Sequence, residues 1–311
     1  MSDGQKKEYA SAIDRFLMQP ADLRILDVVR RCYAVLLLLN VGLLWLDRSL
    51  FFGPGSWLPP ESARAIIDPD TFDLYSIFPE SPLTITLALA VLAAAGLAML
   101  FSWFPRIAAL VTFFLLICVQ HANVMLFDGE DIVFRLFAFY LIFVPPRRDL
   151  EPRQTSEEIS EGTCEASLPS YPVWPVRMFQ LQFCLIYLCT AIQKSDGNEW
   201  LDGTAVYYAL RLDDMTKFPL PAAITESLGW SKFLTWSTLA FEFAVPVLIW
   251  WRRTRWICIV AAVLFHLGLD YAMNLHLFHW IMMVGLLSFV RYDELQAVGR
   301  WVGSRFSGSG G

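Results

Sequence analysis

Long apolar runs, separated by short polar segments, follow one another along almost the whole chain. A helix needs about 20 apolar residues to cross the hydrocarbon core of a bilayer. The runs therefore predict membrane-spanning helices, and two of them, at 131–146 and 276–291, are short for a crossing. The eight predicted spans are 31–46, 82–104, 107–127, 131–146, 174–194, 233–251, 255–275 and 276–291.

The composition agrees with a membrane-embedded chain. Hydrophobic residues make up 56% of the 311 residues, and charged residues only 17%. A soluble domain has about a quarter charged residues, so this chain has too little polar surface to cover a water-soluble globule. The fold class that follows is all-α: a polytopic integral membrane bundle of eight helices whose first partner is the lipid bilayer. The net charge of −6 gives no support to nucleic-acid binding, which needs a basic patch.

The distribution of Lys and Arg predicts the orientation. With the N-terminus inside, most of these residues fall in the segments on the cytoplasmic side, as the positive-inside rule requires. Both termini are therefore expected in the cytoplasm, in a multi-pass protein of the cell membrane. The charged first 31 residues lack the apolar core of a cleavable signal peptide. The predicted parts are an N-terminal segment 1–30, a transmembrane domain 31–291 and a tail 292–311, with outer loops 47–81 and 195–232 and a cytoplasmic loop 147–173.

Ionisable residues inside the spans are the candidate site. Each costs roughly 2.5–3.5 kcal/mol on insertion scales, so each needs a reason to be there. His266, Asp270 and Asn274 recur every four residues and so share one helical face. Most of these residues fall in the middle or outer half of the spans, which predicts a polar cavity open to the outer side. In chain order they are His121, Asp131, Arg135, Lys194, Glu242, His266, Asp270, His276 and His279.

Structural roles stand as alternatives for each of these residues. Asp131 and Arg135 are four residues apart, so they can also form an ion pair that stabilises a helix end. Glu242 can be a protonated, buried carboxyl group that is hydrogen-bonded to a neighbour. His266 and Asp270 can form a hydrogen-bonded pair between helices. The last span begins with His276 and His279, and their side chains can lie at the membrane–water interface. The histidine spacing is compatible with metal binding, but there is no fixed motif and we expect no metal site.

The segment Gln180–Leu210 resembles the horizontally transferred transmembrane (HTTM) domain, the membrane core shared with the vitamin K-dependent gamma-carboxylases. The resemblance covers roughly residues 25–292. Its most specific part is the segment around Lys194; Gly129–Pro145 and His266–Trp280 agree with it. The residues that carry it are Tyr187, Lys194, Trp200, Gly203, Tyr207 and Tyr208, then Asp131 and Arg135, then Asn274 and Trp280.

The resemblance implies a chemistry. In the carboxylases the lysine of this segment is the base that deprotonates reduced vitamin K, so Lys194 is the candidate base here and a reduced vitamin K-like quinone the candidate cofactor. An unprotonated amine in an apolar pocket can take a phenolic proton. The alternative is a Lys194 that only extends to the outer interface. The supporting catalytic candidates are His266, Asp270, Arg135 and Asp131, and the cofactor-binding candidates are His121, Trp200, Tyr207, Asn274 and Trp280.

Two departures from the carboxylases shape the functional prediction. The segment 129–145 has no histidine where the carboxylases have a functional one, and we expect no counterpart of their large lumenal domain. The chain is closer in size to compact SdpB-like bacterial members, which act with a small partner to mature an exported peptide toxin. The interpretation favours an enzyme with carboxylase- or epoxidase-like chemistry on an exported peptide. The alternatives are a maturation factor that acts with a partner protein and, third, a transporter.

Overall fold

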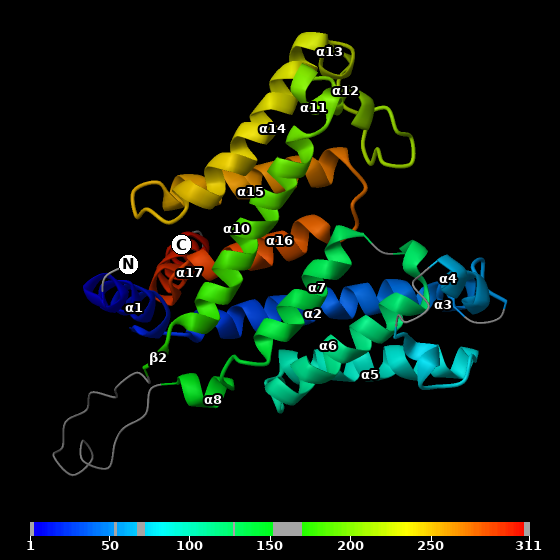
Figure 1. Cartoon of the computed structure of the whole chain (residues 1–311), viewed down its shortest axis with the longest axis horizontal. Coiled ribbons are helices and arrows are strands. Elements are labelled where there is room, and N and C mark those ends of the chain that lie inside the picture. The colour runs from blue at the N-terminus through cyan, green and yellow to red at the C-terminus, as the bar shows by residue number, and fades with distance from the viewer. Residues whose placement is uncertain (1–2, 53–54, 67–71, 127, 152–169, 308–311) are drawn as a thin grey trace. The chain divides into compact units, whose positions relative to one another are not determined.

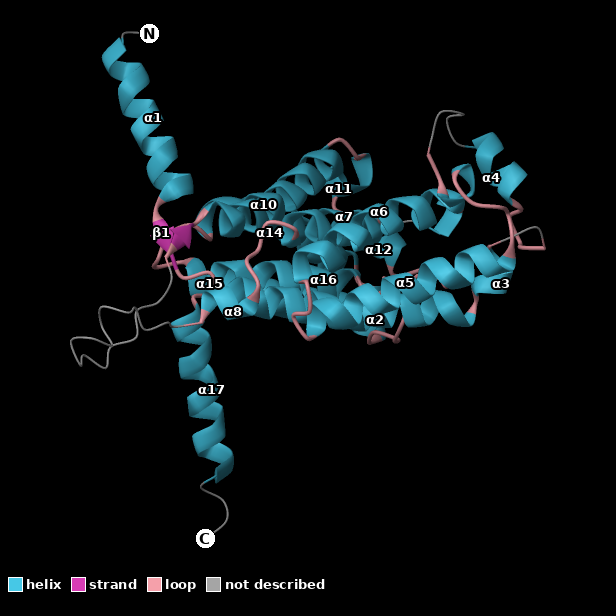
Figure 2. Cartoon of the chain, turned by 90° about the horizontal axis from the view of Figure 1, so that it is seen from below, coloured by secondary structure: helices cyan, strands magenta, loops and turns pink. Residues whose placement is uncertain are grey.

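Helices make up most of the computed structural model, which describes residues 3–52, 55–66, 72–126, 128–151 and 170–307 (Figures 1 and 2). The strands β1 (Pro20–Ala21) and β2 (Tyr171–Pro172) form a two-stranded antiparallel sheet. The prediction of an all-α fold is therefore confirmed. The chain divides into two compact units, the first comprising Met1–Met178 with Val290–Gly311 and the second Phe179–Phe289.

Four long helices form the centre of the first unit. Helix α5 contacts both α2 and α6, and α7 contacts α6 and α2 (Figure 1). Their facing sides bury large apolar side chains, whereas Leu83 and Leu87 on α5 are more than half exposed. Exposed leucines on a long apolar helix are suited to lipid rather than water. The bounds are α2 (Arg24–Leu46), α5 (Pro82–Leu100), α6 (Pro105–Ala122) and α7 (Gly129–Leu141).

Local signals in the sequence set where these helices begin. Ser81 accepts a hydrogen bond from the N–H of Thr84 at the start of α5, and prolines stand in the first turns of α5 and α6. Asp128 caps α7, and the Asp131 carboxylate accepts the N–H of Asp128 in return. Asp131 therefore has a structural role as part of a capping box.

The remaining elements of the first unit are short or terminal. The predicted outer loop 47–81 contains short helices, and its residues 53–54 and 67–71 lie outside the described residues. Most of the predicted cytoplasmic loop 147–173 also lies outside them. These elements are α1 (Asp3–Met18), α3 (Arg48–Phe51), α4 (Pro60–Ile66), η1 (Leu74–Ser76), η2 (Val124–Leu126), α8 (Arg147–Leu150) and α17 (Tyr292–Ser307).

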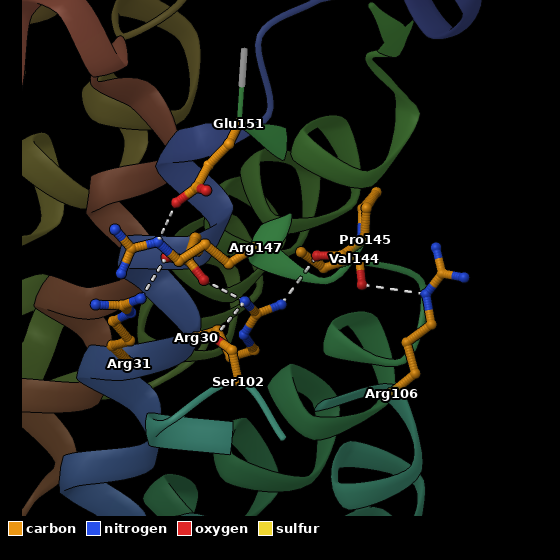
Figure 3. A network of polar contacts seen from close by, with 9 residues as sticks. Arg30, Arg31, Ser102, Arg106, Val144, Pro145, Arg147 and Glu151 are labelled. Atoms are coloured by element: carbon orange, nitrogen blue, oxygen red, sulfur yellow. Dashed lines mark hydrogen bonds and ion pairs between the residues drawn. The ribbon is translucent and has the colours of Figure 1, made fainter. Parts of the chain in front are cut away.

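A buried arginine holds one end of this bundle together (Figure 3). The guanidinium of Arg30, on α2, is fully buried and forms an ion pair with Asp27. It also donates to the carbonyl oxygen of Pro145 at 3.0 Å and to Oγ of Ser102 at 3.2 Å. Pro145 follows α7 and Ser102 follows α5, so one side chain joins three helix ends.

The second unit is built on the rest of α10, on α14, α15 and α16, and on short helices between α10 and α14. The amide of Gln180 on α10 donates to the carbonyl of Ser288 at 2.8 Å, which joins the two ends of the unit. The bounds are α10 (Trp174–Ser195), α11 (Asn198–Asp202), α12 (Ala205–Ala209), α13 (Ala222–Thr225), α14 (Leu228–Leu248), α15 (Arg255–Ala272), α16 (Phe278–Leu286) and η3 (Leu287–Phe289).

Five of the described helices are long and apolar enough to cross a membrane: α2, α5, α6, α10 and α15. The other three predicted spans also contain helices, but α7 has 13 residues, α16 has 9, and α14 carries Lys232 and Glu242. The number of crossings and the side of each terminus stay predictions. Helix α2 begins at Arg24, seven residues before the predicted span, because Asp27 neutralises Arg30 and Arg31 within its first turns.

We expect Arg30→Ala to destabilise the protein by about 3 kcal/mol, because the carbonyl oxygen of Pro145 and Oγ of Ser102 lose their donor, at about 1–3 kcal/mol for each buried group, and Asp27 keeps only the more exposed Arg31. The midpoint of thermal unfolding in detergent measures the loss. Arg24→Ala is the matched control: Arg24 pairs with Asp22 near the surface, where such pairs contribute about 0–1 kcal/mol. Equal midpoints for the two variants would show that the Arg30 network is not needed for stability.

Candidate functional site

A cavity of about 270 Å³ lies within the second unit, between α10, α11, α12, α14, α15 and α16. Most of its walls are apolar, and its polar groups come from four different helices. Such a cavity, apolar with a few convergent polar groups, is the usual form of a small-molecule site. The polar side chains that line it are Tyr187, Thr190, Lys194, Thr238, Glu242, His266 and His279.

Lys194 and Glu242 form the charged part of this cavity. Nζ of Lys194 lies 2.5 Å from Oε1 of Glu242, and 4.7 Å from the ring centroid of Trp200. The side chain of Lys194 is 27% exposed and that of Glu242 only 6%. The second carboxylate oxygen of Glu242, Oε2, is buried and has no hydrogen-bond partner in the described part of the chain. A buried acceptor without a partner is costly, so Oε2 is a natural contact for a ligand.

The sequence around Glu242 explains its position. Ser227 caps α14 by accepting from the N–H of Trp230, and an apolar helix follows. Pro246 stands four residues after Glu242 and has no N–H, so the carbonyl of Glu242 loses its helical hydrogen bond. Glu242 therefore lies at a local weakness of the helix, with its side chain turned to Lys194.

Three aromatic side chains form a second polar group in the cavity. The hydroxyl of Tyr187 lies 2.6 Å from Nε2 of His266, and Nδ1 of His266 lies 3.2 Å from Nδ1 of His279. All three side chains are buried, and Nε2 of His279 has no partner among the described residues. Tyr187 and Lys194 are seven residues apart on α10, about two helical turns, so they share the face that lines the cavity.

A tight turn between α11 and α12 brings Trp200 to Lys194. Gly203 ends α11 with a φ of 86°, in the left-handed region that favours glycine. Lys232 packs against it so closely that a Cβ at position 203 would lie 2.7 Å from the Cγ of Lys232. Just before the turn, Asp202 accepts from the hydroxyl and the N–H of Thr204, and these hydrogen bonds lower the pKa of the Asp202 carboxyl.

Of the candidates predicted in this unit, Lys194, His266 and Trp200 line the cavity together. The other four do not line it. Asp270 pairs with Lys217 at 3.3 Å, and the N–H of Asn274 donates to the carbonyl of Met215 at 2.7 Å. The ring of Tyr207 lies under the guanidinium of Arg211, with 3.5 Å between the ring centroid and Cζ. Trp280 is exposed on α16.

The remaining candidates, His121, Asp131 and Arg135, belong to the first unit and contact residues there. Nδ1 of His121 lies 2.8 Å from the carbonyl oxygen of Phe72, and Nη1 of Arg135 lies 3.2 Å from Nε2 of His121. Asp131 accepts from the amide of Gln120 at 3.0 Å. These partners differ from the Asp131–Arg135 ion pair that the spacing allowed.

Three ionisable residues of the cavity were not among the predicted catalytic or cofactor-binding residues: Glu242, Tyr187 and His279. Each had a signal in the sequence. Glu242 is an acidic residue inside an apolar helix, and Tyr187 precedes Lys194 by seven residues. His279 is one of the two histidines that open the last predicted span, and the structure buries it, whereas His276 is exposed at the turn before α16. No three His, Cys, Asp or Glu side chains of the described ranges lie close enough together to hold a metal ion.

The HTTM domain family model matches residues 18–293, so the chain belongs to this family and is a multi-pass membrane protein. The predicted resemblance is therefore confirmed. The chain is 23% identical over 211 residues to the sporulation-delaying protein SdpB of Bacillus subtilis, covering 66% of this chain and 64% of SdpB. It is 24% identical over 195 residues to the uncharacterized protein YitO of the same organism, covering 58% of this chain and 57% of YitO.

The chain thus spans less than two thirds of the length of these relatives. No solved structure matches it.

We expect Gly203→Ala to destabilise the protein by about 1–3 kcal/mol, the usual cost of a non-glycine residue in the left-handed region, with a clash against Lys232 in addition. Gly268→Ala is the control. Gly268 lies within α15, away from its ends, and a Cβ added there would have no atom within 4 Å. It should leave stability unchanged or raise it by up to about 1 kcal/mol. Thermal unfolding measures both, and a fully stable Gly203→Ala variant would contradict the assigned turn.

Proposed function

We propose that this chain is a membrane enzyme in which the Lys194–Glu242 pair removes a proton from a hydroxyl group of a quinol-like or lipid-like molecule. The observation that carries the proposal is the buried, unpartnered Oε2 of Glu242 beside Lys194 in a cavity with apolar walls. The HTTM family membership supports it, since the same segment carries the catalytic lysine in the carboxylases that it resembles.

The pair can accept one proton. Nζ of Lys194 and Oε1 of Glu242 share a short hydrogen bond, so they are either an ion pair or a neutral amine beside a carboxylic acid. In both cases one site remains for a proton, and full protonation gives an ammonium beside a carboxylic acid. The ligand O–H bond breaks, its proton passes to the pair, and its electron pair stays on the ligand oxygen. Such positioned proton transfer contributes about 100-fold or more to a rate.

A second cavity, of about 560 Å³, supports an amphiphilic ligand. It shares six lining residues with the first: Val206, Ala209, Thr238, Phe265, Leu269 and Met273. Its other walls include Leu220, Ile224, Leu234 and Leu264. A molecule with a small polar head and a long apolar tail would match the two cavities.

A reduced vitamin K-like quinone is of this class. When bound, it would supply an ionisable ring hydroxyl. Glu242 and Lys194 would hold that hydroxyl, Trp200 would cover the lysine, and the apolar side chains would exclude water from the reacting oxygen.

The product of this chemistry would act on an exported peptide. The predicted orientation places the Lys194 end of α10 on the outer side of the cell membrane, where such a peptide is accessible. The family resemblance supports this side, because the carboxylases act in the lumen, which corresponds to the bacterial exterior.

A second candidate function is a maturation factor for an exported peptide toxin that acts with a small partner protein, without chemistry of its own. The match to SdpB favours it. The two functions differ in their dependence on Lys194, because a non-catalytic factor would still support maturation of its peptide as the Lys194→Met variant. If the gene for this protein is deleted and the exported peptide still matures as before, the second function is excluded.

We expect Lys194→Met to abolish the protein-dependent oxidation of menadiol, a short naphthohydroquinone, by dissolved oxygen. A deprotonated quinol reacts with oxygen faster than the neutral form, so a protein that removes the proton accelerates the appearance of quinone absorbance. The acceleration should fall by about 100-fold in the variant. Lys217→Met is the matched control, because Lys217 pairs with Asp270 and does not line the cavity.

An acceleration by Lys194→Met equal to that of the unchanged protein would disprove the role of the pair. Glu242→Gln tests the other half, since it keeps the shape but removes the carboxylate, and it should lose the acceleration as well.

The predicted orientation is tested by cysteine labelling with a membrane-impermeant maleimide. A cysteine in place of Asn198, in α11, should react in intact cells. A cysteine in place of Arg148, which is exposed in α8, should react only after the membrane is opened. The chain without added cysteines gives the background. The opposite pattern would place the Lys194 end of α10 in the cytoplasm and remove the exported substrate from the proposal.

A further inference from the structure

The hydrogen bonds between Tyr187, His266 and His279 can be arranged in two ways. In the first, the Tyr187 hydroxyl donates to Nε2 of His266, Nδ1–H of His266 donates to Nδ1 of His279, and His279 carries its proton on Nε2. In the second, every donor is reversed: Nδ1–H of His279 donates to His266, and Nε2–H of His266 donates to the oxygen of Tyr187.

The two arrangements differ in how many buried groups they leave without a partner. The first leaves one, the Nε2–H of His279. The second leaves two, because the hydroxyl hydrogen of Tyr187 then has no acceptor among the described residues and Nε2 of His279 has no donor. Buried polar groups without partners are costly, so the first arrangement is favoured.

On this basis we propose that His279 is a catalytic hydrogen-bond donor to the ligand oxygen, with its Nε2–H directed into the cavity by Tyr187 through His266. This inference rests on the proposed function, in that the ligand is the one deprotonated by Lys194 and Glu242. His266 and Tyr187 are positioning residues, because they act on the ligand only through His279.

Two buried atoms of cavity-lining residues, each without a partner among the described residues, define the ligand more closely. Oε2 of Glu242 accepts a proton or a hydrogen bond, and Nε2–H of His279 donates one. The polar head must therefore present a hydroxyl oxygen that gives its hydrogen to Oε2 and accepts the Nε2–H, within one cavity of about 270 Å³. A ring hydroxyl of a hydroquinone can do both.

A donor aimed at an oxygen that becomes negative stabilises that charge more strongly than it stabilises the neutral hydroxyl. Donors of this kind contribute about 100-fold or more to catalysis in a site that excludes water. The Lys194–Glu242 pair, from α10 and α14, would thus remove the proton, and His279, from α16, would stabilise the negative charge left on the ligand oxygen.

Nitrogen NMR of the full chain labelled with ¹⁵N-histidine, in lipid nanodiscs and without ligand, tests the direction of the hydrogen bonds. Single variants of the four histidines assign the signals. We expect His266 protonated at Nδ1 and His279 at Nε2, with both signals shifted in Tyr187→Phe. A proton on Nδ1 of His279 would overturn the proposal. This measurement does not depend on Lys194 or on activity, so it separates this inference from the proposed function.

Two variants of His279 then test its role in the menadiol assay. The side-chain amide of His279→Gln can place an N–H near the position of Nε2, whereas His279→Leu cannot. We expect His279→Leu to lower kcat by about 100-fold and His279→Gln to recover a large part of that loss. His276→Gln, at an exposed histidine, is the control and should be fully active. Equal activity of His279→Leu and the unchanged protein would overturn the proposal.

Discussion

A polar group enclosed by apolar helices must find its partner inside the protein, because neither lipid nor a dry core offers one. This constraint shapes both units of the chain. In the first, the buried guanidinium of Arg30 is paired with Asp27 and reaches acceptors that follow two other helices. In the second, Lys194 and Glu242 pair with each other across α10 and α14. The same requirement thus produces a structural clamp in one unit and a candidate reaction centre in the other.

The difference between the two sites lies in what surrounds the paired groups. The acceptors of Arg30 are the backbone and a serine at helix ends, which belong to the fold itself. The Lys194–Glu242 pair instead lines a cavity, and two buried atoms of cavity-lining residues, Oε2 of Glu242 and Nε2 of His279, have no partner among the described residues. A second, apolar cavity shares six lining residues with the first. Polar atoms left unsatisfied beside an apolar groove are the physical basis for assigning an amphiphilic ligand to this unit.

The sequence was informative about the candidate site where the signal was local, and less so where a partner was distant in the chain. Lys194 was found from its segment, and its contact Trp200 lies only six residues further on. Asp270 was grouped with His266 because four residues separate them on one helix. The structure gives them different partners, Lys217 for Asp270 and Tyr187 with His279 for His266. Helical spacing shows which side chains share a face, but the packed neighbour decides what each of them binds.

The sequence alone determined the all-helical fold, the family and the lysine segment, because hydrophobic run length, caps such as Ser81 and Asp128, and the residues around Lys194 are properties of short stretches of chain. Only the tertiary structure decided that Glu242, 48 residues from Lys194, is its partner, and that Tyr187, His266 and His279 form one hydrogen-bonded group. These contacts depend on which faces of α10, α14, α15 and α16 pack together. The packing of these faces depends on the burial of many apolar side chains together, so it cannot be predicted from any single residue or spacing.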